Sequence, residues 1–89
     1  MTAEYVNWCC EELLRNTKLT KATVRAGAED DSNLWIFTLE CEIGQVKKAL
    51  SYAALRTKHQ EMRDPSLFYN ELETMARAVV DVAEEDYAR

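Results

Sequence analysis

Glycine and proline are scarce in this 89-residue sequence, which contains two glycines and one proline. Phosphate-binding loops of nucleotide sites are usually glycine-rich, so this composition argues against such a loop. Few breakers also favour long regular elements over irregular connections. We therefore expect a small number of helices and strands and no bound nucleotide.

Long apolar runs and a basic leader are absent as well. No apolar run approaches the roughly 18 residues that cross a bilayer, and the first residues lack the positive charge of a secretory signal. The cysteines are odd in number, which does not suit a disulfide framework. These features predict a cytoplasmic protein with no membrane partner and with reduced cysteines.

The chain also lacks a recognisable ligand or catalytic set. Its soft-metal ligands are Cys9, Cys10, Cys41 and the single histidine His59. Their spacing fits no structural zinc pattern, and a buried cysteine without a ligand role behaves as a small apolar residue. General acid–base catalysis needs an oriented pair of groups, and His59 has no evident partner. We expect no metal, no cofactor and no enzymatic activity.

What the sequence does contain is typical of one small globular domain spanning residues 1–89. It is 47% apolar and 30% charged, with a net charge of −5. A chain of this size buries only about 60–65% of its unfolded surface, so its margin of stability is thin. The negative charge argues against nucleic acid, which is bound through basic surfaces.

The periodicity predicts a helix from Ala3 to Asn16, with one apolar stripe and one polar face. Trp8 falls at the flank of this stripe. The residues expected to be buried are Val6, Cys10, Leu13 and Leu14.

Two strand-like runs follow, from Leu19 to Ala26 and from Leu34 to Cys41. Both are rich in β-branched or aromatic residues, and the polar segment 28–33 between them has the composition of a turn. They predict an antiparallel hairpin in which Trp35, Phe37, Leu39 and Cys41 share one face.

A helix is predicted from Ile43 to Arg63, where Ile43, Val46, Leu50, Ala53 and Ala54 would form the buried stripe and the basic residues would face outward. Pro65 then begins the last helix, which runs to about Asp86. Residues 45–63 carry a net +4 and residues 64–89 a net −5. We expect these two complementary segments to pack antiparallel.

The predicted fold is therefore α+β, in the order helix, β-hairpin, helix, helix. An all-α four-helix bundle is the alternative, because apolar residues keep a helical spacing without a break from Ile36 to Thr57. That alternative places Gly44 inside a helix at a cost of about 1 kcal/mol. It also leaves residues 17–33 as a long unstructured connection, which compact domains avoid.

One local similarity concerns Glu12–Asn16, Lys18 and the hairpin Ala22–Leu39. This stretch resembles the helix and hairpin of histidine-kinase-type ATPase domains. The DxGxG motif of that family is not present after the second strand, where Glu42–Val46 has one glycine and no aspartate. The similarity is thus coincidental: it is compatible with the hairpin and implies no nucleotide site.

Functionally, we predict a small acidic adaptor, regulator or inhibitor that acts by contact with another protein. So thin a core cannot cover bulky aromatic residues on both faces of a strand, and a symmetric homodimer is the first solution we expect. A nucleic-acid-associated module using the basic face of helix 43–63 is the alternative. The candidate interaction residues are Trp8, Trp35, Phe37, Tyr52, Glu29, Asp30, Asp31, Lys47, Lys48 and Arg56.

Overall fold

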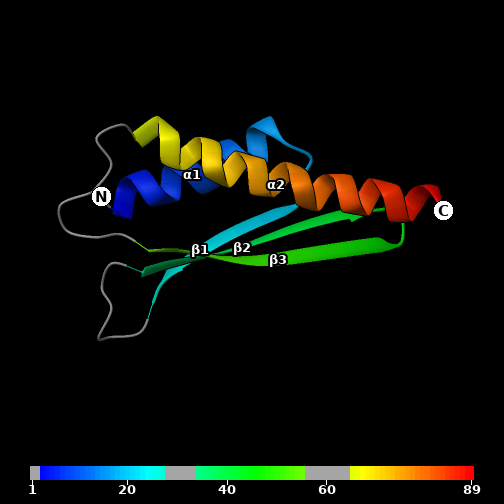
Figure 1. Ribbon diagram of the computed structural model, residues 1–89, viewed down its shortest axis with the longest axis horizontal. Helices are drawn as coiled ribbons and strands as arrows, with labels where there is room; N and C mark the ends of the chain where they lie inside the picture. The colour runs from blue at the N-terminus through cyan, green and yellow to red at the C-terminus, as the bar shows by residue number, and fades with distance from the viewer. Residues whose placement is uncertain (1–2, 28–33, 56–64) are drawn as a thin grey trace.

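Two helices lie on one face of a three-stranded antiparallel sheet in the computed structural model of the chain (Figure 1). The structure describes residues 3–27, 34–55 and 65–89. The strand order is β1-β2-β3, so β1 and β3 form the two edges of the sheet. In chain order the elements are α1 (Ala3–Asn16), β1 (Lys21–Ala26), β2 (Leu34–Ile43), β3 (Val46–Leu55) and α2 (Pro65–Ala88).

The α+β class is confirmed, as are the first helix, the hairpin of the first two strands and the last helix. The predicted helix 43–63 is wrong. Ile43 ends β2 and Val46–Leu55 is a third strand, while residues 56–63 of that prediction lie outside the described part of the chain. The four-helix alternative is wrong for the same reason, because residues 21–55 contain three strands.

Gly44 explains why the chain turns back instead of continuing as a helix. It has a φ of +60°, and Ile43 pairs with Val46 across a two-residue loop. A positive φ at the first central residue alone is the pattern of a type II′ turn, whose twist suits a β-hairpin. The alanine-rich segment after the turn has good helix propensity. Pairing with β2 over ten residue pairs overrides this local preference.

The core lies between the sheet and the helices. Because side chains alternate along a strand, Phe37, Leu39 and Cys41 of β2 all face the helices and are fully buried. Phe37 meets Phe68 of α2 edge-on, with 5.7 Å between ring centroids. This geometry is favourable for an aromatic pair and anchors α2 to the central strand.

Helix α1 contributes four buried residues, and one expectation for it is corrected. Its buried residues are Val6, Cys9, Cys10 and Leu13. Leu14 was expected in the core but is 41% exposed. The buried face is centred on Cys9 and Leu13, which are four residues apart and both fully buried. Leu14 is one residue further along the helix and therefore points away from the core.

Helix α2 runs antiparallel to β3, whereas the prediction was of two antiparallel helices. The Lys48 Nζ atom lies 2.5 Å from an Asp86 carboxylate oxygen, and at the other end of the strand the Tyr52 hydroxyl donates a hydrogen bond to Glu71. The partner of the acidic helix is thus a basic strand and not a basic helix.

We expect Gly44→Ala to lower the free energy of unfolding by about 1–3 kcal/mol, because a left-handed φ strains any residue with a Cβ. The new Cβ would also clash with the ring of Tyr87, which would have to move. Urea unfolding checks this, with the exposed neighbour Gln45→Ala as the control. Equal losses in both variants would contradict a special role for the glycine.

We expect Phe37→Ala to cost about 3–5 kcal/mol, since it opens a cavity at the centre of the core. The matched control is Ile36→Ala, one residue earlier on the opposite and partly open face of β2, which should cost about 1 kcal/mol. Thermal or urea unfolding measures both. A Phe37 variant as stable as the Ile36 variant would show that the ring is not the centre of the core.

Candidate interaction surface

The outer edge of β3 presents backbone groups that bond to no other described strand. In the turn, Ile43 and Val46 form the hydrogen-bonded pair that closes the hairpin. Hydrogen-bonded and non-bonded pairs alternate from there, so the even-numbered residues of β3 bond to β2. The N–H and C=O groups of Lys47, Ala49, Ser51 and Ala53 therefore point away from the sheet.

The other side of β2 supports this assignment independently. The carbonyl groups of Leu34 and Glu40 accept hydrogen bonds from the N–H groups of Gly27 and Thr20, on the side of β1. Even-numbered residues of β2 thus bond toward β1, and odd-numbered ones toward β3. Their partners in β3, such as Leu50 opposite Leu39, are the even-numbered residues.

The two edges of the sheet differ in length and charge. Strand β1 has six residues and carries Lys21 and Arg25, and charged side chains are a common protection of an edge against unwanted pairing. Strand β3 has ten residues, with both of its lysines near one end. The run Ala49–Ala53 contains no charge and no proline. Of the two edges, β3 is the one suited to pairing with another strand.

Beside this edge lies a shallow apolar groove of about 200 Å³ between β3 and α2. Its lining from α2 includes Val82, which is 45% exposed. We call the outer edge of β3 together with this groove the β3 edge surface. The groove is lined by Lys48, Ala49, Leu50, Ala78, Val79 and Val82.

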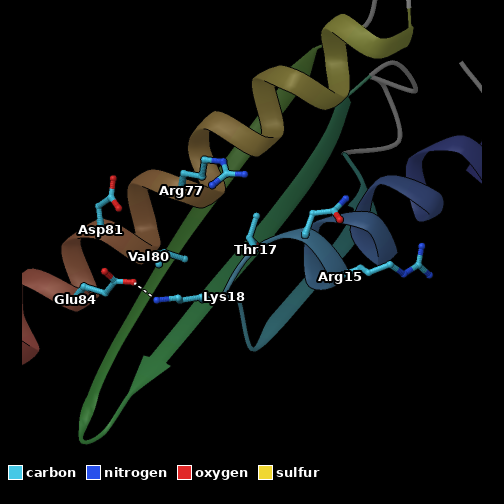
Figure 2. A pocket seen from close by; sticks show the side chains of 8 residues that line it. Arg15, Thr17, Lys18, Arg77, Val80, Asp81 and Glu84 are labelled. Carbon is cyan, nitrogen blue, oxygen red and sulfur yellow. Dashed lines mark hydrogen bonds and ion pairs between the residues drawn. The ribbon is translucent and has the colours of Figure 1, made fainter.

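A larger and more polar pocket of about 530 Å³ lies between the end of α1 and α2 (Figure 2). Lys18 and Glu84 bridge the two elements there, with 3.0 Å between Nζ and Oε1. Arg15 pairs with Glu12, and Arg77 lies 3.6 Å from Glu73. Since each of its three cations already has an acidic partner, the pocket offers no unpaired cation to an anionic ligand.

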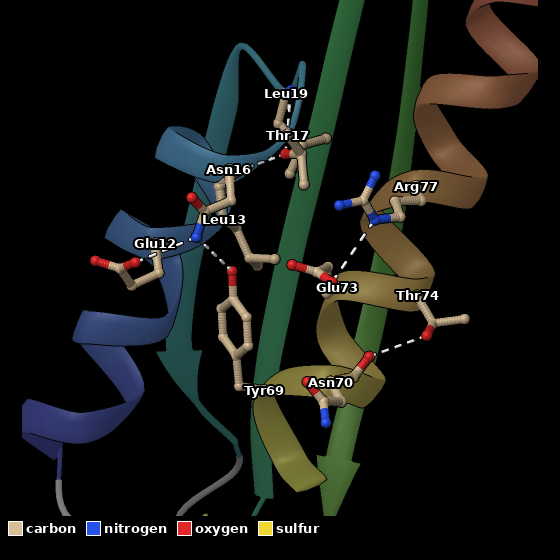
Figure 3. A network of polar contacts seen from close by, with 10 residues as sticks. All are labelled: Glu12, Leu13, Asn16, Thr17, Leu19, Tyr69, Asn70, Glu73, Thr74 and Arg77. Atoms are coloured by element: carbon tan, nitrogen blue, oxygen red, sulfur yellow. Dashed lines mark hydrogen bonds and ion pairs between the residues drawn. The ribbon is translucent and has the colours of Figure 1, made fainter. Parts of the chain in front are cut away.

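A polar network next to this pocket fixes α1 against α2 (Figure 3). The Asn16 amide donates to the Tyr69 hydroxyl over 3.1 Å and to a Glu12 carboxylate oxygen over 3.2 Å. Burial raises the pKa of Tyr69, and the hydrogen bond from Asn16 partly offsets that rise. The network joins two helices and is explained by packing alone.

The predicted aromatic residues lie in different environments. Trp8 is 43% exposed and stacks on Tyr5, with ring centroids 5.5 Å apart. Trp35 is half-buried at the margin of the core, and Phe37 is enclosed completely. Tyr52 is half-buried beside α2. A partner can reach Trp8 directly, whereas Phe37 has no surface to offer.

Lys47 and Lys48 do not share a basic face, because neighbouring residues of a strand point to opposite sides. The Lys47 Nζ atom lies 3.2 Å from Glu40 on the open face of the sheet, whereas Lys48 contacts Asp86 of α2. The remaining candidates, Glu29, Asp30, Asp31 and Arg56, lie outside the described residues.

The sequence analysis missed Ala49, Ser51, Ala78 and Val82, although they line the β3 edge surface or expose its backbone groups. The missed indication was the Gly44–Gln45 pair between two β-compatible runs, which is typical of a hairpin turn. With residues 43–63 assigned to a helix, no free strand edge could be foreseen.

The three cysteines are buried thiols. Burial raises the pKa of Cys10 to about 11 and also raises the pKa of Cys41, so both are protonated at neutral pH. The Cys41 thiol donates to the Lys18 carbonyl over 3.4 Å. Within residues 3–27, 34–55 and 65–89, no group of three or more potential metal ligands is found.

No described helix is long and apolar enough to cross a membrane. Comparison of the chain with models of protein families, with curated proteins and with solved structures finds no match.

The ion pair between Lys48 and Asp86, at the end of the groove, can be tested by titration of Asp86. The hydrogen bond from Lys48 holds the pKa of Asp86 below its ordinary value of 3.8. A lowered pKa stabilises the fold above the ordinary value, and this contribution is lost as the pH falls through the pKa of the folded state. In Lys48→Met, an NMR titration should show the Asp86 pKa returning toward 3.8.

Lys47→Met is the matched control, since Lys47 lies on the opposite face beside Glu40. It should leave the titration of Asp86 unchanged. A similar rise in both variants would mean that general charge, and not the Lys48 contact, lowers the pKa of Asp86.

Proposed function

We propose that this chain is a non-enzymatic protein-interaction module, an adaptor, regulator or inhibitor, and that it binds through the β3 edge surface. The observation that carries the proposal is the row of outward N–H and C=O groups on Lys47, Ala49, Ser51 and Ala53, which follows from the register of β2 and β3. An extended segment of a partner can add to such an edge as a further strand.

The apolar groove supports this mode of binding. In strand addition, backbone hydrogen bonds supply affinity, and pockets beside the edge accept side chains and supply specificity. Val82 and Ala78 border the groove from α2, while Leu50 borders it from β3. A partner strand with apolar side chains on its helix-facing side would pack them into this groove. Both the groove residues and the partner's side chains would then be removed from water.

The nucleic-acid alternative has no comparable support. It depended on a basic helical face, and the two described lysines of that face point to opposite sides of a strand and contact acidic residues. An intracellular, reducing location suits the proposed function, because Cys9, Cys10 and Cys41 are thiols without a disulfide.

Proline at position 51 tests the function directly. The Ser51 N–H points outward, so Ser51→Pro should remove an edge donor without breaking the ladder to β2, and proline is tolerated on such edges. Ser51→Ala keeps the N–H and is the matched control. We expect partners captured from lysate by the tagged chain to be retained by wild type and Ser51→Ala and lost, by tenfold or more, with Ser51→Pro.

Circular dichroism and thermal unfolding must show that Ser51→Pro is folded. Partners that bind all three proteins equally would place the contact elsewhere on the chain. If they instead depended on Trp8, tested by Trp8→Ala, the exposed Trp8 ring on α1 would replace the β3 edge as the binding surface.

A further inference from the structure

We infer that the strand which pairs with β3 is the β3 strand of a second copy of this chain. Two protomers would join across a two-fold axis into one six-stranded antiparallel sheet. This inference rests on the proposed function, because it uses the same β3 edge surface and names its occupant.

Hydrogen-bond direction fixes which faces of the two sheets are continuous. Only odd-numbered residues of β3 point their backbone groups outward, so a hydrogen-bonded pair across the new seam must join two odd-numbered residues. Residues that are directly opposite in an antiparallel pair place their side chains on the same face. Odd-numbered residues of both copies therefore share the open face, and all four helices lie together on the other face.

The charges of the β3 lysines limit the registers in which the two β3 strands can pair. Registers that place Lys47 or Lys48 opposite itself bring like charges together and are unfavourable. The register with Leu50 opposite Leu50 avoids this and pairs residues 46–54 of both copies. It sets Lys47 against Ala53, Ala49 against Ser51 and Lys48 against Tyr52.

This register is also electrostatically complementary on the helix-facing side. The Tyr52 hydroxyl is hydrogen-bonded to the Glu71 carboxylate of α2. Lys48 of the second copy would then lie beside the Tyr52 ring and close to the Glu71 carboxylate. A shift of two residues that centres the seam on Ser51 places Lys48 opposite Ala54 and loses this complementarity.

Helix spacing allows the two copies to meet. Helix α2 packs on both β2 and β3, so its axis lies inward of the edge. With strands about 4.8 Å apart and each α2 centred between its β2 and β3, the two α2 helices would be about 10 Å apart. That is the ordinary distance for packed helices, and a small residue such as Ala78 permits close approach.

The seam would cover the groups that a lone protomer leaves open. Val82, 45% exposed, and the groove beside Leu50 would face the same groups of the second copy. A typical stable interface covers roughly 800 Å² per partner. The chain has 5909 Å² of accessible surface, so such an interface would cover about one seventh of it. A nine-residue strand seam together with one side of the 24-residue helix α2 can supply this area.

Sedimentation of the purified chain over a concentration series tests the occupant. Wild type and Ser51→Ala should approach twice the 10.3 kDa mass of one chain. Ser51→Pro deletes one donor from each copy, and its dissociation constant should rise at least about tenfold. A wild type that stays monomeric at high micromolar concentration overturns the inference.

Amide hydrogen exchange of the wild-type chain gives a readout that requires no substitution. In the dimer, the N–H groups of Ala49, Ser51 and Ala53 should be protected at high concentration and lose protection on dilution. The N–H groups of Lys48, Leu50 and Tyr52 bond to β2 and should stay protected throughout. Association without protection of the odd-numbered amides would place the interface elsewhere and overturn the proposed seam.

Cysteine cross-linking tests the register. With Leu50 on the axis, the two Cα atoms at this position would be about 4.5 Å apart, which suits a disulfide. Under mild oxidation Leu50→Cys should form a covalent dimer several-fold faster than Ala49→Cys or Ser51→Cys. The native cysteines are buried and should not compete. Faster cross-linking at position 49 or 51 would overturn the Leu50 register.

Failure of this inference can be told apart from failure of the proposed function. A monomeric chain that still captures a different protein, and loses it with Ser51→Pro, refutes the dimer and supports strand addition by that protein. A monomer whose contacts ignore the Ser51 substitutions refutes both.

Discussion

The ladder between β2 and β3 is the constraint on which the rest of the structure depends. Its register is set by a two-residue turn at Gly44, the one described position with a positive φ. A shift of one residue would move every side chain of β3 to the other face. With the observed register, Leu50 and Tyr52 face the helices, Lys48 reaches Asp86, and the backbone groups of the odd-numbered residues point outward.

The placement of both helices on one face leaves an asymmetric molecule. Phe37, Leu39 and Cys41 are covered completely, whereas Thr38 and Glu40 on the opposite side of β2 remain partly accessible. Antiparallel sheets commonly have one face on the core and one open to solvent, and the open face here carries polar side chains together with the partly exposed Ile36. The edges are less easily tolerated, since their backbone groups need partners or protection. In this fold, association is therefore more readily expected along the strand edge than across the open face.

Much of the fold could be predicted from local patterns, because the elements concerned follow one strong rule each. The first helix has a clear apolar stripe, β1 and β2 have β-branched residues flanking a polar turn, and Pro65 marks the start of α2. The short connection and the charge contrast between residues 45–63 and 64–89 predicted two antiparallel helices. The antiparallel arrangement holds for β3 and α2, but the predicted partner helix is a strand, so only part of that prediction is confirmed.

Strand β3 could not be predicted with the same rules, since alanine and lysine favour a helix and the apolar positions 43, 46, 50 and 53 fit a helical spacing. The alternation of Val46, Lys48, Leu50 and Tyr52 includes a lysine, whose charged end reaches an acidic helix that the local sequence does not reveal. The candidate surface was missed with it. No residue type marks the unpaired backbone N–H and C=O groups of a strand edge. They can be identified only when the strand order and register are known.

The distribution of lysines along β3 adds a final step. Both Lys47 and Lys48 contact acidic residues of their own chain, Glu40 and Asp86. They stand where the hairpin turns, and the five residues from Ala49 to Ala53 carry no charge. An edge selected only to stay solvated would carry a lysine or a proline near its middle, as protected edges do. In β3 the middle is neutral, short side chains at Ala49, Ser51 and Ala53 flank the outward backbone groups, and an exposed valine lies above them on α2. In the proposed dimer, the lysine charges would restrict the register, and no charge would lie where the second strand approaches.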